Sequence, residues 1–170
     1  MRKLYTLIAL SAISFFSAQA KIGLNAGQAF LYTRNELHNV VDKERLNGFY
    51  AGAFAEFKIT EKVNFGSGLN YINASNLEFL NVPLMMKWYF VPKINLQAGP
   101  QLMWTLKSVP STVNKFNIGI SAGAGFEFTD KVSLEARYNY QTNDYLKDSS
   151  RSTNSTINYL TVGIAYNLAK

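Results

Sequence analysis

Residues 116–128 read Phe-Asn-Ile-Gly-Ile-Ser-Ala-Gly-Ala-Gly-Phe-Glu-Phe, and they alternate strictly between two kinds of side chain. The even-numbered positions are apolar, whereas the odd-numbered positions are glycine, serine, asparagine or glutamate. A period of two puts the two sets on opposite faces of a β-strand. The stretch therefore predicts one long strand with an apolar face and a face of small or polar residues.

The same alternation recurs along the rest of the chain. It is clear in residues 94–106, 132–140 and 160–168, and weaker in residues 21–32, 47–59, 63–72 and 77–90. The strands are joined alternately by related short turns, at residues 59–63, 90–94 and 128–132, and by polar stretches, at residues 33–46, 73–76, 107–115 and 141–155. Short turns at one end and longer loops at the other are typical of a small outer-membrane barrel. We therefore expect eight antiparallel strands with both termini at the short-turn end.

The polar face distinguishes a membrane barrel from a soluble one. A soluble barrel covers its exterior with bulky solvated groups, but here that face carries glycine, serine and amides, which suit a crowded interior. The apolar face carries aromatic residues near both strand ends, as two girdles at the lipid–water interfaces require. The sequence predicts an all-β, eight-stranded, antiparallel, up-and-down transmembrane β-barrel. A lipocalin-like soluble barrel that binds an apolar ligand is the alternative.

Eight strands leave a lumen just wide enough to be filled by side chains, so we expect no open pore. The strand register points charged residues of both signs into this lumen, and buried charges of opposite sign should pair. The expected inward-facing set is Glu56, Lys58, Lys87, Glu127, Glu135 and Arg137.

The composition fits export to a membrane. The chain has 170 residues, of which only 16% are charged and 14% are aromatic, and it has no cysteine. Residues 1–20 combine a basic start, an apolar stretch and a small-residue cleavage motif at Ala18 and Ala20, so we predict a cleaved signal peptide followed by a barrel domain at residues 21–170. The basic residues are scattered rather than gathered on one face, which argues against nucleic-acid binding.

A family resemblance lies in the middle of the chain. Residues 80–90 (Leu-Asn-Val-Pro-Leu-Met-Met-Lys-Trp-Tyr-Phe) place Lys-aromatic at the end of an apolar-Pro-apolar strand, and residues 99–102 (Gly-Pro-Gln-Leu) follow a short turn. This pattern resembles the PorT-like outer-membrane β-barrel domain of Bacteroidota. The resemblance implies an outer-membrane location but no single activity.

Residue types that carry catalysis are scarce in this chain. The sole histidine, His38, lies in the first predicted loop near Glu36, Asp42 and Glu44, which excludes a His-rich metal site and a Cys–His pair. We therefore predict no catalytic, metal or cofactor residues and expect a structural or interaction role at the cell envelope. The expected partners are outer-membrane lipid and, through the loops, envelope or secretion-apparatus proteins. The alternative is a lipid-modifying enzyme that uses His38 with a loop serine.

Overall fold

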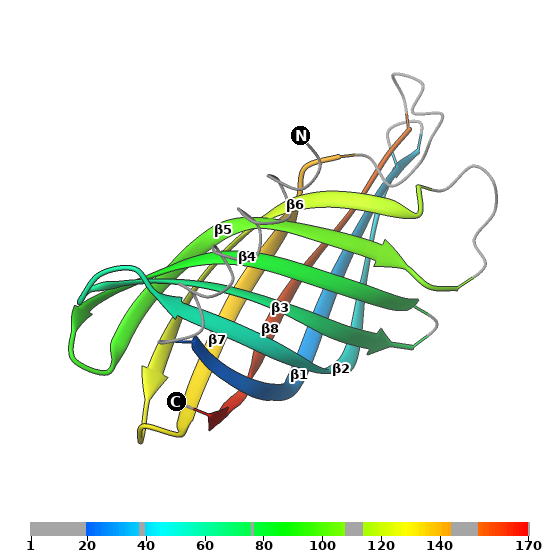
Figure 1. The fold of residues 1–170 in the computed structure, drawn as a ribbon. Coiled ribbons are helices and arrows are strands. Elements are labelled where there is room, and N and C mark those ends of the chain that lie inside the picture. Colours follow the sequence, from blue (N-terminus) through cyan, green and yellow to red (C-terminus); the bar gives the residue numbers. More distant parts are fainter. Residues whose placement is uncertain (1–19, 38–39, 76, 108–113, 144–152, 170) are drawn as a thin grey trace, which may run out of the picture.

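The protein is described by a computed structural model that covers residues 20–37, 40–75, 77–107, 114–143 and 153–169. Its strands follow one another around a closed barrel in sequence order, each antiparallel to its neighbours, and β8 pairs back onto β1 (Figure 1). The strands are β1 Ala20–Leu37, β2 Val40–Lys58, β3 Val63–Ala74, β4 Leu77–Val91, β5 Ile94–Thr105, β6 Phe116–Glu127, β7 Val132–Gln141 and β8 Thr153–Ala169. The predicted eight-stranded fold is confirmed. Among the described residues, no helix is long and apolar enough to cross a membrane.

The two faces of the wall are those that the alternation predicts. On β6, Ile120 is 56% exposed on the outside, while its neighbour Ser121 is fully buried in the lumen. The outer surface is apolar and carries aromatic rings at both rims. Exposed rings at the short-turn end are Trp88, Phe90, Phe126, Phe128 and Tyr166, and those at the loop end are Tyr32, Phe49, Trp104, Phe116, Tyr138 and Tyr140.

Two of the three short turns share one design. The Thr60 hydroxyl oxygen accepts hydrogen bonds from the backbone N–H groups of Lys62 and Val63, at 3.3 and 3.0 Å. The hydroxyl of Thr129 accepts the equivalent pair in the β6–β7 turn, at 3.2 and 3.0 Å. The β4–β5 turn was expected to be of the same type, but it has no threonine there and turns through Lys93 at a φ of 73°. The predicted likeness of the three short turns is therefore confirmed for two of them.

The first predicted loop, residues 33–46, is mostly strand. β1 runs on to Leu37 and β2 starts at Val40, and the two pair throughout, ending at Leu37↔Val40. β8 likewise begins at Thr153 rather than at residue 160. These extensions project past the loop-end rim in Figure 1. The sequence of these extensions does not alternate with a period of two, because a strand outside the apolar layer has no need of an apolar face.

Inside the barrel, glycines make room for large rings. Gly27 pairs with Tyr50 on one side and with Gly163 on the other. A Cβ atom at Gly27 would lie 2.9 Å from Tyr50 Cε1, and one at Gly163 would lie 2.5 Å from Tyr50 Oη. The tyrosine ring can therefore lie against the barrel wall only because both positions lack a side chain.

Candidate functional site

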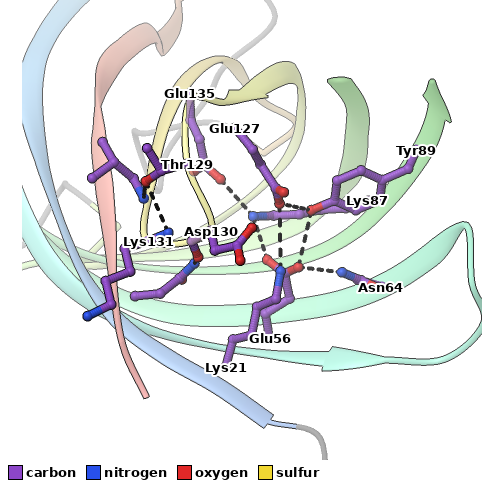
Figure 2. A network of polar contacts seen from close by, with 12 residues as sticks. Lys21, Glu56, Asn64, Lys87, Tyr89, Glu127, Thr129, Asp130, Lys131 and Glu135 are labelled. Carbon is purple, nitrogen blue, oxygen red and sulfur yellow. Dashed lines mark hydrogen bonds and ion pairs between the residues drawn. The ribbon is translucent and has the colours of Figure 1, made fainter. Parts of the chain in front are cut away.

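The lumen at the short-turn end holds a buried cluster of four charges. Lys87 Nζ lies 2.7 Å from Glu56 Oε2 and 2.6 Å from Glu135 Oε1, so one ammonium joins two carboxylates from different strands (Figure 2). Arg137 forms an ion pair with the other oxygen of Glu135. Two cations and two anions cancel, which buried charges require because an unpaired one would lose its hydration without compensation. The predicted pairing is confirmed for these four residues.

Further polar side chains lie between this cluster and the opening of the lumen at the short-turn end, here called the mouth. Asn64 Nδ2 donates a 2.5 Å hydrogen bond to Glu56 Oε1, and Tyr89 Oη donates to Glu127 Oε1 at 2.7 Å. Lys21 Nζ lies 3.7 Å from the same Glu127 oxygen, and this ion pair is not predicted by the alternation along either strand. Figure 2 shows these side chains converging on the short-turn end of the lumen.

The mouth is a cavity of about 280 Å³ lined by Lys21, Glu56, Lys58, Glu61, Asn64, Tyr89 and Glu127. Lys58 was expected to point into the packed lumen, but it is exposed at this mouth. The difference arises because Lys58 is the last residue of β2, at the edge where the lumen opens. Among the described residues, no group of three or more histidine, cysteine, aspartate or glutamate side chains is arranged to hold a metal ion.

Amide side chains fill the next level of the lumen. Asn81 Nδ2 donates to Tyr159 Oη at 2.8 Å and to Gln101 Oε1 at 3.0 Å, and Tyr159 Oη donates to the same Gln101 oxygen at 2.9 Å. Between the neighbouring strands β6 and β7, Ser121 Oγ donates to Asn139 Oδ1 at 2.7 Å. The two hydrogen bonds of Tyr159 Oη join β8 to β4 and β5 across the lumen, so they brace the wall from within.

At the loop end, the lumen holds an apolar cluster beside the buried polar residues Thr105, Asn117 and Gln141. We expected polar packing throughout, and this expectation is wrong for part of the loop end. There, several inward-facing positions are apolar, and they pack into one buried cluster. Its members are Ala29, Leu31, Tyr50, Ile72, Ala74, Phe79, Met103, Ile157 and Tyr159, each at most 5% exposed. This cluster seals the loop end of the lumen.

Beyond this cluster, three strands continue as a small sheet, here called the loop-end sheet: residues 32–37 of β1, 40–45 of β2 and 153–156 of β8. Pairing of β2 with β3 begins only at Phe49↔Asn73, and pairing of β7 with β8 reaches no further than Asn139↔Tyr159. Among the described strands, β1 is therefore the only ladder partner of these parts of β2 and β8. The Arg45 guanidinium carbon lies 5.7 Å from the centre of the Tyr32 ring, at the base of the sheet.

His38, on which the alternative enzyme hypothesis depends, lies outside the described residues, as do residues 108–113 and 144–152 of two other predicted loops. Glu36, Asp42 and Glu44 belong to the paired strands of the first hairpin, with Glu36 opposite Val41 and Glu44 opposite Thr33.

The exterior is apolar and has two aromatic rims, the charges inside are paired, and short turns lie at one end. These features define a small, closed, membrane-spanning β-barrel. The comparison with known families agrees: residues 11–147 match the outer membrane protein beta-barrel domain, so the chain belongs to that family. The protein is therefore an outer-membrane protein, and the soluble lipocalin-like alternative is wrong. In this class the short turns face the periplasm and the loop end faces outward.

Solved barrels of the same size share this fold. Ail, the attachment invasion locus protein of Yersinia pestis, aligns with a TM-score of 0.54 and 14% identity over 88% of this chain and 99% of its own. Neisserial surface protein A aligns with a TM-score of 0.52 and 15% identity over 88% of this chain and 99% of its own. At such identities the likeness concerns the fold alone. No curated protein matches the chain.

Proposed function

We propose that this protein is a non-conducting, non-enzymatic envelope protein that binds a partner through its loop end. The observation that carries the proposal is the sealed lumen: the apolar cluster closes one end, and the paired charges of Glu56, Lys87, Glu135 and Arg137 fill the barrel below it. Because the interior is occupied by side chains, interaction is left to the outward-facing end and to the lipid-facing wall.

The loop-end sheet supports a particular mode of binding. The outer edges of β2 and β8 in this sheet have backbone groups without a neighbouring strand among the described residues, and such edges accept a further strand from another chain. We therefore favour an envelope or secretion-apparatus protein that adds a strand to this edge. The motifs at residues 80–90 and 99–102 support a place among the PorT-like barrels of Bacteroidota.

The test shortens the first hairpin without changing the barrel. Arg34 and Lys43 pair directly, so replacing residues 35–42 by Asn-Gly closes the hairpin with a two-residue turn. A matched control replaces residues 144–152 by a Gly/Ser linker of the same length. Proteins cross-linked to each variant on intact cells are identified by mass spectrometry, after the variants have been shown to insert into the outer membrane in equal amounts.

Loss of a cross-linked partner from the hairpin variant but not from the linker variant is the expected result. If the hairpin variant keeps the same cross-linked partners, the loop-end sheet does not bind them. A steady single-channel conductance in planar bilayers would contradict the sealed lumen. A change in the lipid A profile of the variant His38→Ala would favour the lipid-modifying enzyme instead.

A further inference from the structure

A second, smaller cavity lies deeper in the lumen, where a glycine separates two asparagines. Asn25 on β1 pairs with Gly52 on β2, and Gly52 pairs in turn with Asn70 on β3. A Cβ atom at Gly52 would lie only 2.3 Å from Asn70 Oδ1, so this amide occupies the space that a side chain would fill. The cavity has a volume of about 20 Å³, and Arg137 lines it as well.

Three buried polar atoms on the residues that line this cavity lack a partner. Asn25 Oδ1, Asn70 Oδ1 and Arg137 Nε make no hydrogen bond to any part of the chain that the structure describes. Both asparagines are only 4% exposed. Buried polar groups in folded proteins are almost always hydrogen-bonded, to protein or to ordered water. Two acceptors and one donor around one cavity therefore form a set that a single small molecule can satisfy.

We propose that this cavity is a built hydration site that holds a resident water molecule. The water donates its two hydrogens to Asn25 Oδ1 and Asn70 Oδ1 and accepts a hydrogen bond from Arg137 Nε. The cavity is large enough, because one water needs about 10–15 Å³ by the same measure.

The charges on the cavity wall select water over an ion. A cation would face Arg137 and Lys87, and an anion would face two amide oxygens and the carboxylate of Glu56. A neutral molecule that both donates and accepts avoids both conflicts.

The cavity also lies against Pro83, the proline of the motif at residues 80–90 on β4. The β3–β4 register passes from Ser67↔Leu84 to Asn70↔Asn81, so the described ladder is interrupted at Pro83, which lines the cavity. A proline has no N–H to offer the ladder. The proposed hydration site therefore lies beside an interruption of the β3–β4 ladder.

The test is a crystal structure of the full barrel at a resolution that orders internal water, together with two variants. We expect a density peak within hydrogen-bonding distance of all three atoms in the wild type. Asn25→Leu keeps the shape of the side chain without its polar atoms and should abolish the peak. Asn95→Leu, on β5 outside the cavity, is the matched control and should leave the peak in place.

Three outcomes would overturn the proposal. The wild-type cavity could show no density, which needs no variant to fold. The peak could survive Asn25→Leu unchanged, which would remove the assigned hydrogen bond. A bromide soak could give an anomalous peak in the cavity, which would identify the occupant as an anion.

Discussion

Replacing Lys87 by methionine removes the cation that joins two buried carboxylates. Lys87 Nζ lies 2.7 Å from Glu56 and 2.6 Å from Glu135, and the side chains of the three residues are 9%, 5% and 4% exposed. Removing one partner of a buried ion pair leaves an uncompensated charge, which costs about 3–5 kcal/mol. We expect Lys87→Met to lower the free energy of unfolding by that amount.

The loss should fall mainly on Glu56. Glu135 keeps its ion pair with Arg137, whereas Glu56 keeps a hydrogen bond from Asn64 and the attraction of Lys21 at the mouth. The double variant Lys87→Met/Glu56→Gln should therefore be more stable than the sum of the single losses predicts. Neighbours in one network show such coupling, at about 0.5–3 kcal/mol.

The assay is equilibrium urea unfolding in lipid vesicles, followed by the fluorescence of Trp88 and Trp104, which are exposed on the outer surface. The control is Lys107→Met: its ion pair with Glu78 has side chains 43% and 28% exposed, and an exposed pair contributes less than about 1 kcal/mol. A loss below about 1 kcal/mol for Lys87→Met, or strict additivity in the double variant, would refute the reasoning.

Three further predictions concern the wall and the lumen. Ile120→Arg places a charge on the lipid-facing side of β6 and should cost about 2–4 kcal/mol of unfolding free energy in the same assay; a neutral effect would mean that the faces are inverted. Gly123→Ala should destabilise the barrel, because its Cβ would lie 2.2 Å from a backbone oxygen of β7, whereas Gly66→Ala should be tolerated, since the nearest atom there is 3.8 Å away; equal effects on the urea midpoint would contradict this. Tyr159→Phe removes the hydroxyl that Asn81 donates to and should cost about 1–2 kcal/mol, with an unchanged urea midpoint as the contrary result.

Much of the fold follows from local pattern. The period-two alternation in residues 94–106, 116–128 and 132–140 predicts where the wall lies and which face meets lipid, because successive side chains of a strand must point to opposite sides. It was least informative at the first hairpin. There the strands run on through residues 33–37 and 40–46, where no apolar layer imposes the pattern.

The arrangement of the lumen depends on contacts across the barrel. Parity along each strand is enough to predict that Lys87, Glu135 and Arg137 point inward. Lys87, Glu56 and Glu135 lie on three different strands. Lys87 can bridge the two carboxylates only because barrel closure brings all three residues to the same height.

The sequence by itself thus determined the eight strands, the apolar exterior and the signs of the charges inside, because each of these follows from the alternation of side chains along a single strand. Only the tertiary structure decided the apolar cluster at the loop end, the cavity lined by Asn25, Asn70 and Arg137, and the projecting loop-end sheet. These features depend on the register between strands, which barrel closure imposes on all eight strands together.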